Sequence, residues 1–167
     1  NRKIIIIMFQ RKSENDILLA KLHDCPLFQD LSNSELKTLL GSAHIRNYSA
    51  EEKIFDDGTI GLCFYLIVKG SVNIVSVRNE KTEVIREFTE GGYFSEVHLF
   101  SETAHTVSCI AREISSLLIL AKPDFDELVK MNSKLGNKVL LRFLEFFGKK
   151  LEELYLENRE LKTRLDL

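Results

Sequence analysis

The chain has 167 residues, of which 44% are hydrophobic and 29% charged, and its formal net charge at pH 7 is −2. These values are ordinary for a soluble globular protein of about one domain, and they give no basis for a nucleic-acid-binding surface. The three cysteines, Cys25, Cys63 and Cys109, share no metal-binding spacing, so we expect reduced thiols in a cytoplasmic protein.

The chain begins with a short apolar run, residues 4–9, which basic residues flank on both sides. A membrane helix needs about 18 apolar residues, so contact with a membrane is not expected. Packing on the chain's own domain or on a partner is favoured over the end of a juxtamembrane segment. We treat residues 1–24 as an N-terminal segment, and the opening Asn1, in place of Met, suits a piece of a longer protein.

The stretch DLSNSELKTLL predicts the first well-marked helix. Ser32 suits the N-cap, and Glu35 follows three residues later, as in a capping box. Gly41 suits the end of this helix because glycine is common just after the last turn.

Residues 44–121 contain short apolar or alternating runs, which polar and glycine-containing turns separate. The runs are KIFDD, CFYLIVKG, SVNIVSV, EVIREF, HTVSCIA and SSLLILA. About eight short strands at this spacing predict a small antiparallel barrel or jelly roll, so the fold class is mainly β with flanking helices. The runs SVNIVSV and TEVIREF, joined by RNEK, predict a β-hairpin with a polar tip.

After Lys122 the apolar period becomes helical, and Pro123 suits the first turn of a short helix. A long helix is predicted from about Ser133 to the end of the chain. Along it, apolar residues and one asparagine alternate at spacings of 4 and 3, which is the seam of a coiled coil. The seam consists of Leu140, Leu144, Phe147, Leu151, Leu154, Asn158, Leu161 and Leu165.

We expect this seam to form a parallel homodimer, since a buried asparagine at an a position such as Asn158 favours two parallel strands in register. Pairing with a different chain stays open. Val139, Phe143 and Phe146 form a second apolar face, and a helix that packs only on its own barrel is the alternative. Both faces can be used at once.

The order of helix, β-roll, short helix and long helix resembles the cyclic nucleotide-binding domain family, as in catabolite activator-type regulators. The stretch YSAEEKIFDDGTIGLCFYLIVKGSVNIV is similar to the family's first half, with Gly58, Gly61, Tyr65 and Gly70 in the expected places. FTEGGYFSEVHLFSETAHTV resembles the family's phosphate-binding cassette, and SSLLILAKPDFDELV resembles the strand and helix that follow it.

The resemblance covers roughly residues 25–150. It implies a cyclic nucleotide-binding-type β-roll, a double-stranded β-helix or jelly roll, over residues 25–132. It also implies that residues 133–167 form a C-terminal coiled-coil helix for dimerisation.

In this family the cassette is a short helix after a glycine-rich turn, where backbone N–H groups face an anionic phosphate. A carboxylate of the first turn accepts from a ribose hydroxyl, and an arginine further along pairs with the phosphate. The resemblance makes Glu96 the carboxylate here. It places the ligand cradle at the amides near Phe94, Ser95, Glu96 and Val97, and it brings Thr103, Ala104 and His105 to the ligand from the loop that follows.

The chain departs from the family at several of these positions. Ser95 and Glu51 stand where the family has glycine, and a serine does not readily adopt a positive φ. Thr103 stands at the arginine position, and the loop before it is shorter than usual by about two residues. Losing a charge-assisted contact to a buried phosphate costs on the order of 1.5–3 kcal/mol, roughly tenfold to over a hundredfold in affinity.

Three side chains are candidates for a substitute cation: Arg86, Arg112 and a protonated His105. If one of them acts, the chain is a cAMP or cGMP sensor whose ligand moves the long helix like a lid and changes the geometry of the dimer. If none acts, the chain is a dimerisation or protein-interaction module that kept the fold and lost nucleotide binding. Both interpretations stay open at this point.

We expect neither an enzyme nor a metal cofactor. The sequence has no P-loop, GxGxxG or serine-nucleophile signature. The four histidines are scattered, and the one group that could approach a common point is His98, His105 and Cys109.

Overall fold

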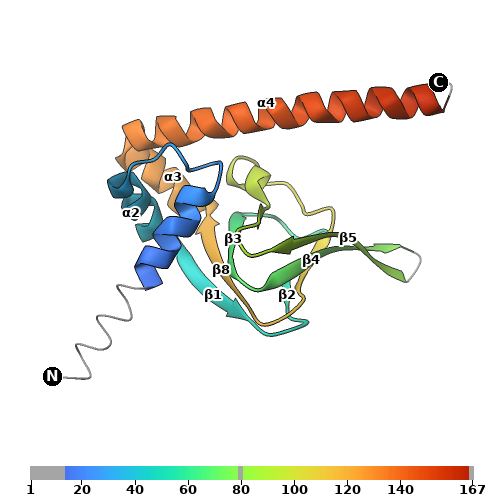
Figure 1. Cartoon of the computed structure of the whole chain (residues 1–167), viewed down its shortest axis with the longest axis horizontal. Helices are drawn as coiled ribbons and strands as arrows, with labels where there is room; N and C mark the ends of the chain where they lie inside the picture. The colour runs from blue at the N-terminus through green and yellow to red at the C-terminus, as the bar shows by residue number, and fades with distance from the viewer. Residues whose placement is uncertain (1–13, 79–80, 166–167) are drawn as a thin grey trace.

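The computed structural model describes residues 14–78 and 81–165. In these residues, two four-stranded antiparallel sheets pack as a β-roll (Figure 1). The first sheet has the order β1 (His44–Tyr48), β8 (Ser115–Ala121), β3 (Cys63–Lys69), β6 (Tyr93–Phe94). The second has the order β2 (Lys53–Phe55), β7 (Ser108–Ala111), β4 (Ser71–Arg78), β5 (Lys81–Thr89). The predicted fold class is confirmed.

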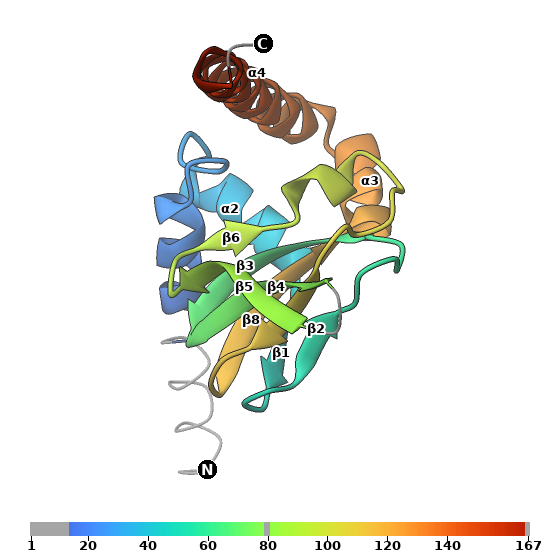
Figure 2. The same cartoon turned by 90° about the vertical axis from the view of Figure 1, so that its right-hand side faces the viewer.

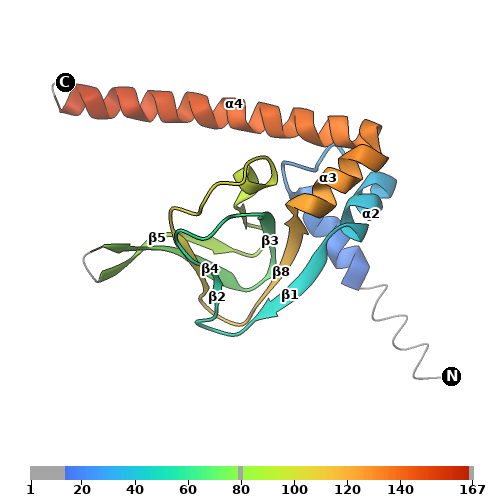
Figure 3. The same cartoon turned by 180° about the vertical axis from the view of Figure 1, so that it is seen from behind.

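The helices lie at one end of the roll and above it. Residues 14–24 are helical, and together with α2 (Asn33–Gly41) and α3 (Lys122–Met131) they cover the end opposite the β4–β5 hairpin (Figure 3). The long helix α4 (Ser133–Arg164) starts at this end and runs over the roll (Figure 1). The short 3-10 helix η1 (Glu96–Leu99) lies between α4 and the sheets (Figure 2).

The start of α2 is fixed by the predicted capping box. The Glu35 N–H donates to Ser32 Oγ at 3.4 Å, and the Ser32 N–H donates to the Glu35 carboxylate at 2.8 Å. Lys138 of α4 also pairs with Glu35 at 2.8 Å. Together, Lys138 and Ser32 lower the pKa of Glu35 to about 2. The carboxylate that begins α2 therefore also holds the first part of α4 in place.

Strands β3 and β8 are buried on both faces, which explains why each reads as an unbroken apolar run. Phe64 and Leu66 of β3 belong to the core beneath the helices, whereas Tyr65 and Ile67 belong to the core between the two sheets. Because side chains alternate along a strand, the same division holds on β8. There the two sets are Leu118 with Leu120, and Leu117 with Ile119.

Helix α4 has two different halves. Its first half buries Leu135, Val139 and Phe143 in the core beneath the helices, so the second apolar face predicted for this helix does pack on the chain's own domain. From residue 148 to residue 165 every residue is exposed.

Among the described residues, no helix combines the length and the apolar character needed to cross a bilayer. The apolar run at residues 4–9 lies outside the described residues, as does the tip of the predicted hairpin at residues 79–80.

Candidate functional site

The predicted cassette, residues 88–107, contributes strand β6, helix η1 and the loop that follows. Ser95 caps η1 in the left-handed conformation, with φ +66° and ψ 23°. Glu51, the other residue that replaces a family glycine, has φ +65°. Both positions therefore demand a backbone that glycine adopts freely and other residues adopt at a cost. Ser95 thus keeps the positive φ of the family glycine, a conformation that serine does not readily adopt.

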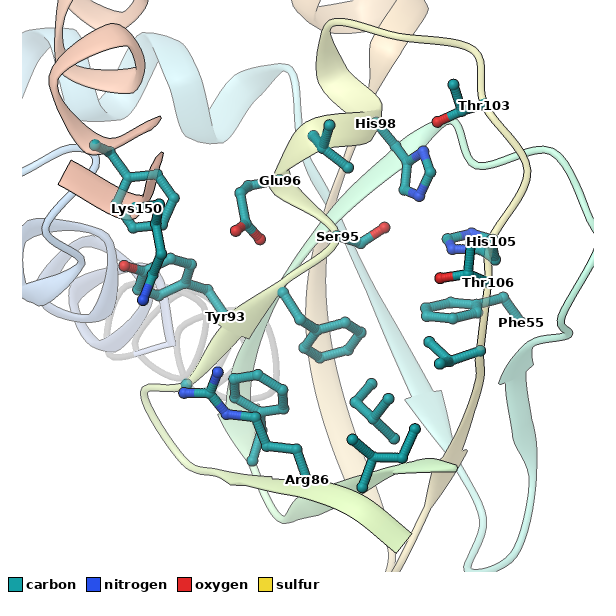
Figure 4. Close-up of a pocket in the computed structure, with 18 of the residues that line it drawn as sticks. Phe55, Arg86, Tyr93, Ser95, Glu96, His98, Thr103, His105, Thr106 and Lys150 are labelled. Atoms are coloured by element: carbon teal, nitrogen blue, oxygen red, sulfur yellow. The ribbon is translucent and has the colours of Figure 1, made fainter. Parts of the chain in front are cut away.

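A cavity of about 790 Å³ opens beside this cassette, between β5, η1, its following loop and the middle of α4 (Figure 4). Its floor and walls are largely apolar and include Phe55, Ile74, Phe88 and Val107. All seven residues that the sequence assigned to ligand contact line this one cavity. They are Phe94, Ser95, Glu96, Val97, Thr103, Ala104 and His105.

Glu96 lies at the side of the cavity nearest to α4. Figure 4 shows its carboxylate on the same side as Lys150 and Tyr93. Burial raises the pKa of Glu96, and the positive charges of Lys150 and Arg86 counter part of this rise. The side chain is half-buried and faces the cavity, so it is not an exposed carboxylate at a helix start.

Arg86 reaches the cavity because of a register shift in the hairpin. Ile74 pairs with Arg86, while the next residue of β4 pairs with Val84, so Ile85 is an additional residue on β5. As a result, the consecutive residues Ile85 and Arg86 both line the cavity. The Arg86 guanidinium lies 4.5 Å from the centre of the Phe88 ring.

The other candidate cation, Arg112, does not line the cavity. Its guanidinium binds the carboxylate of Glu87 instead. Helix α4 adds two cations that the sequence did not mark, Lys149 and Lys150, and Lys150 pairs with Glu153 at 2.7 Å. Nothing short of knowing that α4 passes over the cassette could have identified these lysines.

Two histidines form the opposite side of the cavity. His98 and His105 are 6% and 7% exposed, and their ring centroids lie 4.3 Å apart. His105 also stacks on Phe55 at 3.7 Å. Burial lowers the pKa of both rings, that of His105 to about 4, with proximity to His98 as its second cause. The sequence pointed to His105 as a ligand contact but not to His98.

Close packing against Gly61 fixes the orientation of His98. A Cβ atom at Gly61 would lie only 2.4 Å from the His98 ring, so no other residue fits there without moving the histidine. The Gly61 N–H donates to the carbonyl oxygen of Thr103 at 3.0 Å. Cys109 belongs to the core between the sheets, and the described residues contain no group of three metal-ligating side chains.

Replacing Ser95 with glycine should stabilise the protein. A left-handed backbone costs a non-glycine residue about 1–2 kcal/mol, and glycine gives back about 0.4–1 kcal/mol of this through the greater freedom of its unfolded chain. The Ser95 hydroxyl is also buried without a hydrogen-bond partner among the described residues, which adds to its cost. We expect Ser95→Gly to raise the free energy of unfolding, measured with urea, by about 1 kcal/mol.

Glu51→Gly is the matched control, because Glu51 has nearly the same φ but is exposed. It should give the smaller backbone gain alone. If Ser95→Gly is no more stabilising than Glu51→Gly, the buried hydroxyl carries no cost. If Ser95→Gly is destabilising, the account of this turn is wrong.

The family model described as the cyclic nucleotide-binding domain matches residues 45–132. The cAMP-dependent protein kinase regulatory subunit of Mycosarcoma maydis is 29% identical over 106 residues, which are 63% of this chain and 20% of that protein. The human potassium/sodium hyperpolarization-activated cyclic nucleotide-gated channel 4 is 27% identical over 128 residues, 75% of this chain and 10% of the channel. The chain thus spans a fifth or less of these two relatives.

Solved structures share the fold. The catabolite activator protein of Thermus thermophilus superposes with a TM-score of 0.72 at 25% identity, over 82% of this chain and 63% of that one. A cyclic nucleotide-binding domain from Methylobacillus flagellatus gives a TM-score of 0.71 at 24% identity, over 85% and 80% of the two chains.

Proposed function

The chain belongs to the cyclic nucleotide-binding domain family, and from this premise we propose that it is a non-catalytic regulatory domain whose cavity takes a cyclic nucleotide such as cAMP or cGMP. Occupancy of the cavity would pass to a partner or to a downstream output through α4. We also propose a cytoplasmic location and no contact with nucleic acid or membrane.

One observation carries this proposal: the cavity is shared between the cassette and α4. Phe146, Lys149 and Lys150 of α4 line it together with Ser95 and Glu96. The Phe146 ring lies 6.1 Å from that of Tyr93, next to the cassette turn. A ligand that contacts both elements binds more tightly when α4 is close, so it shifts the population of α4 positions by its difference in affinity.

In this proposal Glu96 accepts a hydrogen bond from a ribose hydroxyl, and the backbone around Phe94, Ser95 and Val97 contacts the phosphate or ribose. Thr103, Ala104 and His105 border the phosphate. The aromatic and aliphatic walls remove the ligand from water. Residues 25–132 form the ligand-binding unit, residues 133–167 the coupling helix, and residues 1–24 an N-terminal segment.

Thermal unfolding tests the ligand. A molecule that binds the folded state raises the melting temperature in proportion to the logarithm of its concentration above Kd. We expect cAMP or cGMP to raise it, and Glu96→Ala to remove most of the rise. Equal rises in both proteins would show that the nucleotide binds somewhere other than the cassette.

We also propose that the chain forms a parallel homodimer, and the exposed half of α4 supports this. Most of the seam predicted for a coiled coil is exposed in the single chain, and Phe147 is half-buried. A row of exposed leucines at this spacing buries its apolar surface when two helices pair in parallel, with Asn158 setting the register.

Leu154 and Leu156 give a matched test of this pairing. Leu154 lies in the seam and is 59% exposed, whereas Leu156 lies outside it and is 48% exposed. Size-exclusion chromatography with light scattering should show a dimer for the unchanged chain and for Leu156→Asp, and a monomer for Leu154→Asp. A monomeric unchanged chain at every concentration would remove the homodimer.

One observation favours the second function, a dimerisation or protein-interaction module without ligand. Thr103 supplies no charge where the family has arginine, so the cavity side formed by His98 and His105 is neutral at pH 7. If neither nucleotide moves the melting temperature and Leu154→Asp still abolishes a dimer, this second function replaces the first.

A further inference from the structure

The permanently charged side chains of the cavity lie on one side of it, and the two histidines lie on the other. Glu96, Arg86 and Lys150 lie toward α4, while Ser95, His98, His105 and Thr106 gather on the opposite side (Figure 4). By resemblance, this opposite side receives the phosphate, since Thr103 stands there at the arginine position. The described residues place no arginine or lysine on it. Any positive charge at this side must come from the two imidazoles.

Two polar atoms on this side of the cavity are buried without a hydrogen-bond partner among the described residues. One is Nδ1 of His98, which lies on the part of the ring that packs against Gly61. The other is the hydroxyl of Ser95, beside the two imidazoles. The hydroxyls of Thr103 and Thr106 line the same side. Buried polar atoms without partners are uncommon and often mark a site that a ligand or an ion completes.

Resting on the proposed function, we propose that His98 and His105 form a proton-dependent anion subsite, which binds the phosphate of the ligand when the pair takes up one proton. An imidazolium donates from both ring nitrogens and supplies the charge that Thr103 lacks. The 4.3 Å between the two rings disfavours a second proton, because two like charges so close repel.

Among the described residues, neither ring of the pair forms an ion pair with a carboxylate. On the β2–β3 connection, Asp56 pairs with Lys53 at 2.7 Å. The cavity's other charged groups, on η1, β5 and α4, are Glu96, Arg86, Lys149, Lys150 and Glu153. The pKa of His105 responds to burial and to His98 and to no carboxylate, so the empty cavity holds neutral rings at pH 7.

Because the rings are neutral in the empty cavity at pH 7, the affinity for an anion should depend on pH. An anion stabilises the protonated pair, so the pair's pKa is higher in the complex than in the empty cavity. Affinity therefore rises as pH falls through the interval between the two pKa values, by up to about tenfold per pH unit. The affinity stops rising once the pH is low enough to protonate the histidine pair in the absence of ligand.

Calorimetric titration with cAMP at pH 7.5, 6.5 and 5.5, with a chelator present to exclude metal binding, measures this dependence. We expect tighter binding at each lower pH and the uptake of close to one proton, read from two buffers of different ionisation enthalpy. His98→Gln and His105→Gln should each flatten the dependence. His44→Gln, which removes an exposed histidine of β1, should leave it unchanged.

Glu96 needs its own control because its pKa is raised and it also titrates in acid. Glu96→Gln should weaken binding at every pH but keep the slope if the histidines cause it. A slope that disappears in Glu96→Gln and persists in His105→Gln overturns the subsite. So does cAMP binding whose affinity does not change with pH, a result that leaves the proposed function intact.

A second probe separates the subsite from the nucleotide. Sulfate keeps a constant charge over this pH range, and NMR titration of the histidine ring protons reports the pKa of each ring. Sulfate should raise the pKa of His98 or His105 and leave that of His44 unchanged. If cAMP gives no heat at any pH but sulfate acts in this way, the nucleotide function fails and the subsite stands. If sulfate moves neither ring, the subsite is overturned.

Discussion

Replacing Phe143 with alanine should lower the free energy of unfolding by about 3–5 kcal/mol, as expected for a fully buried aromatic side chain. Phe143 is 1% exposed, and its ring centroid lies 4.8 Å from that of Phe100 and 6.0 Å from that of Phe28. Phe100 directly follows η1, so this one side chain joins α4 to the cassette. The variant should therefore also loosen α4 from the ligand cavity.

Urea unfolding at a fixed protein concentration measures this loss. Leu156→Ala, on the exposed half of the same helix, is the control, and it should change the free energy of unfolding by less than about 0.5 kcal/mol. A loss below about 1 kcal/mol for Phe143→Ala would mean that α4 does not pack on the roll as described.

Replacing Thr103 with arginine should tighten cyclic nucleotide binding by roughly tenfold to over a hundredfold. The change supplies a permanent positive charge on the side of the cavity formed by His98 and His105, and a charge-assisted contact to phosphate contributes on the order of 1.5–3 kcal/mol. Thr103 is exposed and lines the cavity, so a longer side chain has room. The same charge should also weaken the pH dependence, because it disfavours protonation of the nearby histidines.

Thr103→Met separates charge from size, since methionine is long and apolar. Calorimetric titration should show little gain for Thr103→Met beside the gain for Thr103→Arg. An equal gain in both variants would assign the effect to packing. No gain in Thr103→Arg would mean that the phosphate does not lie on this side of the cavity.

The fold was predictable because its signals are local. Ser32 and Glu35 are spaced as a capping box, and the structure contains both of its hydrogen bonds. The hairpin pairs from Ser71 with Thr89 to Arg78 with Lys81, as the two alternating runs indicated. The long helix begins at Ser133, where the helical period of the sequence begins. Each of these features is marked by a pattern within one continuous stretch of the chain.

The cavity was predictable only in part. The resemblance identified the cassette, and its seven residues do line one cavity. The sequence did not show which distant elements close it. Arg86 enters through a one-residue register shift on β5, and Lys150 enters because the first half of α4 is anchored by Phe143. Such contacts depend on tertiary packing, which a linear pattern does not encode.

The role of His98 could not be predicted from the sequence either, because it too depends on tertiary packing. In the sequence it is an isolated histidine, but in the structure it lies 4.3 Å from His105 and against Gly61. Only the folding of the β2–β3 connection over η1 brings these three residues together.

The most direct test of the central claim is calorimetric titration of the chain with cAMP and with cGMP, beside Glu96→Ala. We expect saturable heat with one of the nucleotides at one site per chain, and a loss of most of that affinity in Glu96→Ala. Absence of heat up to millimolar nucleotide at both pH 7.5 and pH 5.5, or binding that Glu96→Ala leaves unchanged, would contradict it.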